Sequence, residues 1–250
     1  MKKNFKLFCF GFGQVAKYFV KSLVNDNIKF DLIATNTSKT ELKSFNNIKY
    51  KSYHFFNNEF DKDLLKDLYS SNKVIISIPP KNKTDIVIKN FRKYFKQKQF
   101  NWITYLSATS VYGDKKGKWV DEKSSTKPTS GRGNDRLNAE KKWMKLYKDF
   151  KLPIQIFRLS GIYSIEPGEI YNTSNNYPCS NEEIANYALA LLKLPTPKKI
   201  NVKDINDKIL RNFYRDSKKV SNKKMKKYFN YKLRYPTYKE GLDMIKNHKL

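Results

Sequence analysis

Short apolar runs alternate with amphipathic stretches over the first 160 of the 250 residues, and this alternation limits the possible folds more than any other feature. Five of the runs have the length and composition of buried strands. They cover residues 6–10, 29–35, 73–79, 101–107 and 154–160, and a weaker candidate covers residues 48–55. Parallel strands need long crossover connections, which are usually helices. The pattern therefore predicts an α/β fold with a doubly wound parallel sheet.

Helical spacing is clearest directly after the first strand. Val15, Ala16, Phe19, Val20 and Leu23 fall on one face of a helix and form an apolar stripe suited to covering a sheet. Further helices are expected over residues 62–69, 84–95 and 135–149. Strands and helices thus follow one another in turn along the main part of the chain.

The sequence changes in character after residue 160. A strand is expected over residues 169–174 and a helix over 181–192, and a Pro-Thr-Pro break at 195–197 separates them from a lysine-rich helical tail. We expect the lysines of residues 217–227 to form the solvated face of a helix. The sequence thus predicts a main domain over residues 1–160 and a smaller C-terminal subdomain over residues 161–250.

The chain carries 51 Lys and Arg against 23 Asp and Glu, a formal net charge of +28. Such an excess is typical of proteins that bind nucleic acid or anionic membranes. Most of it is lysine spread along the whole chain, however, whereas base and phosphate recognition favours the bidentate guanidinium of arginine. We therefore expect no specific nucleic-acid partner, only adhesion to polyanions at low salt. Apolar runs stay far shorter than the roughly 18 residues of a membrane span, so we expect no membrane partner and a cytoplasmic protein.

Cysteine and histidine are scarce. Cys9 lies in a predicted buried strand, Cys179 lies in a predicted loop, and His54 and His248 are far apart in the sequence. Two cysteines make no disulfide framework, and two histidines make neither a zinc site nor a Ser-His-Asp triad. We therefore predict no metal site and no triad hydrolase.

The first predicted strand runs directly into Gly11-Phe12-Gly13-Gln14-Val15-Ala16, which opens the first helix. In such a G-x-G-x-x-A turn, the first glycine permits the tight bend, and the second lets the backbone approach a pyrophosphate. The helix N-terminus offers unpaired amides to the phosphates, here those around Gln14 and Val15. The strand before and the helix after the motif favour a dinucleotide cofactor. The alternative is that the two glycines only make a turn.

The second strand ends without the acidic residue that usually binds the ribose of NAD. Spacing alone points to Asp31, but Asp31 begins that strand, and ligands bind at the carboxyl ends of parallel strands. The carboxyl end instead carries several donors and one cation, which suit a 2′-phosphate: Asn36, Thr37, Ser38 and Lys39. NADP is therefore favoured over NAD. The alternative is that Ser38 caps a following helix and Lys39 is solvated.

Residues 105–114, Tyr-Leu-Ser-Ala-Thr-Ser-Val-Tyr-Gly-Asp, resemble the fifth-strand segment of the extended short-chain dehydrogenases/reductases, the NAD-dependent epimerase/dehydratase family. Segments 11–16, 76–80, 157–163 and 235–242 agree with this family in order. The resemblance implies a Rossmann-type dinucleotide-binding domain over residues 1–160, a reduced substrate subdomain over 161–250, and a homodimer formed through two helices. Pro79 and Pro80 either fix an extended loop against the cofactor or only end a strand.

The sequence departs from this family where its enzymes carry their catalytic pair. Those enzymes use a Tyr and a Lys four residues later, supported by a Ser or Thr from the fifth strand. The corresponding positions here are Arg132, Arg136 and Ala108, and Ala108 is flanked by Ser107 and Thr109. A guanidinium stays charged and cannot act as a general acid or base near neutral pH. The chain thus resembles atypical members with an Arg-x-x-x-Arg arrangement.

Arg132 and Arg136 remain candidates for a role in the site because they share one helix face. They either clamp an anionic group of the substrate or cofactor, or form an ion pair with Asp135 or Glu140.

Two hydroxyl groups are the other catalytic candidates. Tyr112 is either a proton donor, acidified by cationic neighbours such as the two arginines, or an aromatic side chain that packs under the loop. Ser107 and Thr109 each either bond a nicotinamide or substrate carbonyl or satisfy backbone groups at the strand end. The first role is favoured for Ser107 and the second for Thr109.

A second departure lies at residues 161–172, where the family normally inserts a strand-plus-helix unit and this chain joins the two ends almost directly. The substrate subdomain is therefore expected to be small. Three functions remain open. The first is an NAD(P)-dependent oxidoreductase or epimerase/dehydratase-type enzyme acting on a small anionic substrate, and the second is a non-catalytic NAD(P)-binding sensor or assembly module. The third, which the scattered lysines disfavour, is a nucleic-acid binder that uses the basic surface.

Overall fold

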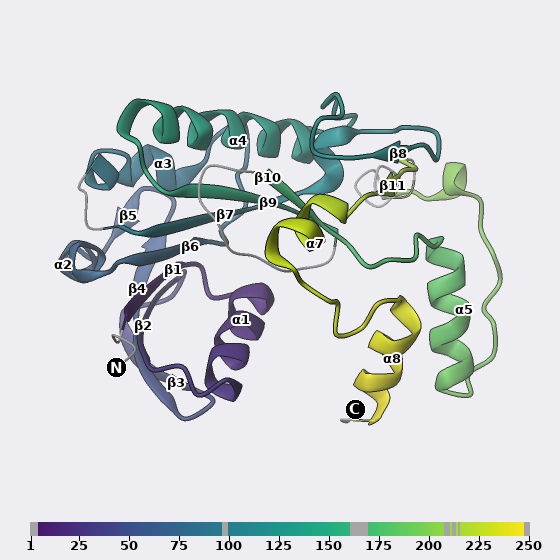
Figure 1. The fold of residues 1–250 in the computed structure, drawn as a ribbon, viewed down its shortest axis with the longest axis horizontal. Helices are drawn as coiled ribbons and strands as arrows, with labels where there is room; N and C mark the ends of the chain where they lie inside the picture. The colour runs from purple at the N-terminus through teal and green to yellow at the C-terminus, as the bar shows by residue number, and fades with distance from the viewer. Residues whose placement is uncertain are drawn as a thin grey trace.

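A nine-stranded, mostly parallel sheet forms the centre of the molecule, in the order β10-β9-β7-β6-β1-β2-β4-β3, with β5 paired to β4 (Figure 1). The computed structural model describes residues 5–96, 100–160, 170–207, 211, 214 and 216–247. The strands are β1 (Phe5–Phe10), β2 (Phe30–Asn36), β3 (Glu41–Phe45), β4 (Ile48–Phe56), β5 (Glu59–Phe60), β6 (Lys73–Ile76), β7 (Trp102–Ala108), β9 (Ile154–Leu159) and β10 (Ile170–Thr173). β3 and β5 pair antiparallel with β4, and the other pairs of this sheet are parallel.

Helices cover both faces of the sheet, which makes the fold doubly wound (Figure 1). The helix α1 (Gln14–Asn25) packs Ala16, Val20 and Leu23 against one face. The helices α2 (Leu64–Ser70), α3 (Ile86–Phe91) and α4 (Gly131–Phe150) share the core of the other face. The buried carboxylate of Asp85 joins α3 to α4, because it caps α3 and accepts a hydrogen bond from Trp143 Nε1 at 2.9 Å.

The predicted α/β fold with a doubly wound parallel sheet is confirmed. All five main strands and the weaker strand at 48–55 are present, with small shifts at their ends. The sequence patterns did not predict β3, an antiparallel strand that lies beyond β4. Its hairpin turn, Asn46-Asn47, has φ values of +47° and +63°, and asparagine is one of the residues that tolerate this conformation.

The C-terminal part of the chain is joined to the rest through strand pairing. β10 extends the central sheet, and β11 (Lys219–Val220) pairs in parallel with β8 (Trp119–Val120). The prediction of a helix over residues 217–227 is therefore wrong for the first half of this range. The helix α7 (Lys223–Phe229) begins only after β11. The division of the chain at residue 160 stays a prediction.

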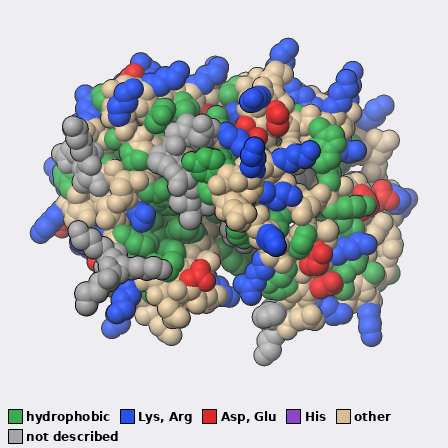
Figure 2. Space-filling model, viewed as in Figure 1, with side chains coloured by type: hydrophobic (Ala, Val, Ile, Leu, Met, Phe, Trp, Pro, Cys, Tyr) green, Lys and Arg blue, Asp and Glu red, His purple; other side chains and the backbone are tan. Residues whose placement is uncertain are grey.

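The helices α5 (Asn181–Leu191) and α8 (Tyr238–Asn247) lie side by side at one end of the molecule (Figure 1). Of the helices that the structure describes, none is long and apolar enough to cross a membrane. Lysine and arginine side chains are scattered over the face shown in Figure 2 rather than gathered in one patch.

Candidate functional site

The turn between β1 and α1 is open toward solvent. Gly11 has a φ of +81°, a conformation that strains residues with a side chain. Gly13 occupies the N-cap position of α1, and no side chain caps the helix there. Gly13 and Gln14 are exposed, and Val15 is half-buried. Because the first amides of a helix have no partner within it, this turn presents N–H groups and the positive end of a helix dipole.

The ends of two neighbouring strands support this turn. The amide of Gly11 donates to Thr35 Oγ1 at 2.8 Å, and Thr35 is buried in β2. On the other side, the carbonyl of Phe10 accepts from the amides of Ser77 at 2.9 Å and Ile78 at 3.2 Å, just beyond β6. The carboxyl ends of β1, β2 and β6 therefore meet at the glycine turn, the place where parallel α/β sheets bind ligands.

The space beside the two glycines shows what the turn can accept. A Cβ atom on Gly11 would lie 3.0 Å from Ile78 Cγ1, so that position is filled by protein. A Cβ atom on Gly13 would meet only Ser77 Oγ, at 3.7 Å. The backbone of Gly13 is thus accessible, and the residues present fit a diphosphate group. Pro79, exposed, and Pro80, buried, follow at the same edge.

The loop after β2 does not begin a helix, so the alternative that Ser38 caps one is wrong. Asn36 Oδ1 accepts the amide of Ser38 at 2.6 Å, and Asn36 Nδ2 donates to Ser52 Oγ at 2.6 Å. The chain then enters β3 at Glu41. Thr37, Ser38 and Lys39 are exposed.

The hydroxyl group of Ser107 is buried at the carboxyl end of β7. Ser107 Oγ donates to Glu140 Oε1 at 2.6 Å. Glu140, on α4, forms a buried ion pair with Arg158 of β9, with Arg158 Nη2 and Glu140 Oε2 2.8 Å apart. Arg158 Nε also donates to Glu140 Oε1 at 3.1 Å. The structure thus directs the proton of Ser107 toward a carboxylate inside the protein.

Tyr112 continues this buried network. Arg158 Nη1 donates to the Tyr112 hydroxyl at 2.9 Å, and that hydroxyl donates to Asn172 Oδ1 at 2.7 Å. The backbone amide of Asn172 donates to Glu122 Oε1 at 2.7 Å. Burial raises the pKa of Tyr112, and the charge and hydrogen bond of Arg158 offset only part of this effect. The expected acidification of Tyr112 by Arg132 and Arg136 is therefore wrong.

The two arginines lie at the start of α4 in different environments. Arg136 is half-buried, and its Nη1 donates to the carbonyl of Leu106 at 2.9 Å. Arg132 is exposed, and no hydrogen bond or ion pair of a described residue involves it.

The alternative in which the two arginines pair with Asp135 or Glu140 is wrong. Asp135 accepts the amide of Lys83 at 2.7 Å, and Glu140 pairs with Arg158.

From the sequence, Ser77 and Arg158 had no individual role in this region, and Glu140 was considered only as a partner of Arg132 or Arg136. Ser77 faces the glycine turn, and its signal was the Ile-Ser-Ile-Pro-Pro segment after β6. Glu140 and Arg158 carry the buried network, yet they are 18 residues apart in the sequence. Only the packing of α4 on β9 brings that pair together. The expected direct connection at residues 161–172 falls mostly on residues 161–169, which lie outside the described residues.

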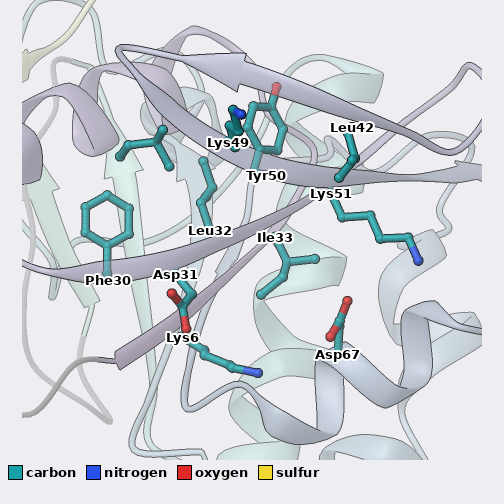
Figure 3. A pocket seen from close by; sticks show the side chains of 11 residues that line it. Lys6, Phe30, Asp31, Leu32, Ile33, Leu42, Lys49, Tyr50, Lys51 and Asp67 are labelled. Carbon is teal, nitrogen blue, oxygen red and sulfur yellow. The ribbon is translucent and has the colours of Figure 1, made fainter.

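Two cavities lie away from the glycine turn. One, of about 300 Å³, is at the amino ends of β1, β2 and β4, where Lys6, Lys51 and Asp67 surround Ile33 (Figure 3). The other, of about 470 Å³, lies between α3 and α4. Among the described residues, no group of three or more His, Cys, Asp or Glu side chains could hold a metal ion.

No protein-family model and no curated protein matches the chain. Solved structures do match. A functionally unknown conserved protein from Silicibacter pomeroyi is 26% identical over 98% of this chain and 99% of that chain, with a TM-score of 0.84.

Two enzymes are similar over nearly the whole chain. A dTDP-glucose 4,6-dehydratase from Bacillus anthracis in complex with NAD is 16% identical, with 96% of this chain and 94% of that chain covered and a TM-score of 0.71. A UDP-glucuronic acid 4-epimerase from Bacillus cereus in complex with NAD is 14% identical, with 95% and 94% covered and a TM-score of 0.72. At these identities the likeness establishes a Rossmann-like fold, the fold of epimerase and dehydratase enzymes.

Proposed function

We propose that this chain is an atypical extended short-chain dehydrogenase/reductase and that it binds a nicotinamide dinucleotide at the carboxyl ends of β1, β2 and β6. The observation that carries the proposal is the uncapped, exposed N-terminus of α1 directly after the Gly11 bend. Backbone amides and a helix dipole at such a place bind phosphate groups. The similar dehydratase and epimerase structures are complexes with NAD, which supports the same class of cofactor here.

NADP rather than NAD is the proposed form of the cofactor. The loop of residues 37–40 carries hydroxyl groups and Lys39 but no carboxylate. An acid at this place binds the ribose 2′-hydroxyl of NAD and would repel a 2′-phosphate. A second cation, Lys17, extends from α1 to the hairpin, where its Nζ lies 5.9 Å from the centre of the Phe45 ring.

For the reaction, we propose an oxidoreductase or epimerase/dehydratase-type conversion of a small anionic substrate. A bound nicotinamide would supply the hydride chemistry. Arg132, exposed at the start of α4, would hold the anionic group, while Arg136 fixes α4 to β7 through the Leu106 carbonyl. Ser107 keeps an oxygen that can accept a hydrogen bond. Because Tyr112 directs its proton to Asn172, water would carry the proton that the substrate exchanges.

A second candidate function is a non-catalytic NAD(P)-binding sensor or assembly module. The observation that favours it is that both candidate hydroxyls, Ser107 and Tyr112, are buried and bonded to other side chains. The homodimer, the cytoplasmic location and the lack of a specific nucleic-acid partner stay predictions from the sequence.

Fluorescence titration of the purified chain with NADPH and with NADH tests the cofactor proposal. We expect saturable binding of NADPH at micromolar concentrations and weaker binding of NADH. No saturation by either nucleotide at high micromolar concentration would contradict both candidate functions. Turnover of sugar nucleotides or keto compounds then separates the two, since a sensor binds the cofactor without consuming it.

A further inference from the structure

The chain crosses over the end of β4 on its way from β2 to β3. In the sheet β4 lies between these two strands, parallel to β2 and antiparallel to β3. Residues 37–40 must therefore pass across the carboxyl end of β4. This crossing segment lies at the edge of the sheet that also carries the Gly11 turn, because the register pairs Asn36 with His54 and Gly11 bonds Thr35.

His54 holds the crossing segment at two points. Its ring Nδ1 lies 2.8 Å from the carbonyl oxygen of Ser38, and its backbone amide donates to Thr40 Oγ1 at 3.0 Å. A carbonyl oxygen only accepts, so Nδ1 carries the proton in this contact. Asn36 fixes the start of the segment through its bonds to the Ser38 amide and to Ser52. Both backbone groups of Ser38 are thus held.

The side chains of the crossing segment remain available. No hydrogen bond in the described part of the chain uses the side chains of Thr37, Ser38 or Lys39, and all three residues are exposed. The nearest acid along the chain, Glu41, has its Oε1 3.1 Å from Lys43 Nζ. The segment therefore combines a fixed backbone with free hydroxyl and ammonium groups, an arrangement that preorganises donors for an anion.

We propose that His54 is a positioning residue that sets the preference for a dinucleotide carrying a 2′-phosphate, by fixing the segment that would contact this group. The inference rests on the proposed cofactor function. Discrimination between NADP and NAD would then depend on His54 in the β3–β4 hairpin as well as on residues 37–40. His54 does not touch the phosphate in this account. It acts through the Ser38 carbonyl and the Thr40 hydroxyl.

The experiment compares Kd values for NADPH and NADH in three test variants, one control variant and the unaltered chain. His54→Leu removes the ring donor, whereas His54→Asn can keep an N–H near the place of Nδ1. Thr40→Val removes the acceptor for the His54 amide at little change in volume. Leu42→Thr is the control, because Leu42 is 80% exposed on the same hairpin and outside the crossing segment.

We expect His54→Leu to weaken NADPH binding by roughly five- to tenfold, the effect of one positioned hydrogen bond, and to change NADH binding less than about twofold. Thr40→Val should also raise the ratio of the NADPH Kd to the NADH Kd. His54→Asn should restore most of the NADPH affinity that His54→Leu loses. An unchanged NADPH/NADH ratio in both His54→Leu and Thr40→Val, with wild-type NADPH binding intact, would overturn this inference alone. Failure of the unaltered chain to bind either nucleotide would overturn the proposed function and this inference together.

Discussion

The two halves of the carboxyl edge of the sheet differ in whether their polar groups are exposed or buried. At the ends of β1, β2 and β6, the amides of α1 and the side chains of residues 37–39 are exposed. At the ends of β7, β9 and β10, the polar side chains are buried and bond to one another in the order Ser107, Glu140, Arg158, Tyr112 and Asn172. The first half, the open half, leaves its polar groups accessible to solvent, as the proposed cofactor site requires. The second half, the buried half, joins the sheet to α4, and Arg132 lies exposed at the start of that helix.

The largest expected effect tests whether the buried half is structural. Glu140→Gln leaves the charge of Arg158 buried without its partner, and this should lower the free energy of unfolding by about 3–5 kcal/mol. Urea denaturation measures the change.

The paired replacement Glu140→Met with Arg158→Met should recover much of that loss, since it removes both charges together. If Glu140→Gln is as stable as the unaltered chain, the buried network contributes little to the free energy of unfolding. The buried half of the edge would then not be primarily structural.

The next effect tests the open half. Gly13→Val would place a side chain in the accessible space beside Ser77 and should weaken NADPH binding at least roughly 100-fold, which corresponds to about 2.7 kcal/mol. Fluorescence titration gives the Kd.

Gly131→Ala is the matched control, because Gly131 also lies at a helix start and a Cβ atom there meets nothing within 4 Å. Equal affinities for Gly13→Val and Gly131→Ala would mean that the phosphates do not approach Gly13.

A smaller effect separates the roles of Tyr112. Tyr112→Phe leaves Arg158 Nη1 and Asn172 Oδ1 without their partner and should destabilise the fold by about 1–3 kcal/mol. Tyr69→Phe is the control, since Tyr69 is partly exposed and packs edge-on against Tyr94. If Tyr112→Phe abolishes turnover of an identified substrate without loss of stability, Tyr112 acts in catalysis and the network is not mainly structural.

The smallest effect concerns alkaline pH. The raised pKa of Tyr112 means that the unfolded chain releases this proton first, near the ordinary value of 10.0. The stabilisation is complete below that value and is lost as the pH rises through the pKa of the folded state. The difference in unfolding free energy between the unaltered chain and Tyr112→Phe should therefore shrink between about pH 8 and about pH 10.5. A difference that grows over this range would contradict the raised pKa.

The open half was largely predictable because its signals are local. Gly11, Gly13 and the following helix lie within a few residues of one another, and each has a conformational reason for its place. The end of β2 was placed correctly for the same reason. The antiparallel β3 was not, since a short half-exposed strand at the far edge of a sheet has no strong apolar pattern.

The buried half was not predictable because its contacts join residues far apart in the sequence. Ser107 and Tyr112 could be singled out from their segment, but their partners Glu140 and Asn172 are 33 and 60 residues further along. Glu140 was recognised only as a possible partner of Arg132 or Arg136. The partner of Glu140 is instead Arg158, because the register of β7, β9 and β10 places Arg158 between Ser107 and Asn172.

The first amides of α1 are proposed to hold the diphosphate of a nicotinamide dinucleotide. The decisive measurement is a titration with NADPH that follows the amide ¹H–¹⁵N shifts of the assigned protein. We expect the largest saturable changes at Gly13, Gln14 and Val15, with smaller changes at Ser77 and Ser38. Saturable binding that leaves the amides of Gly13–Val15 unmoved, or no binding at all, would contradict this proposal.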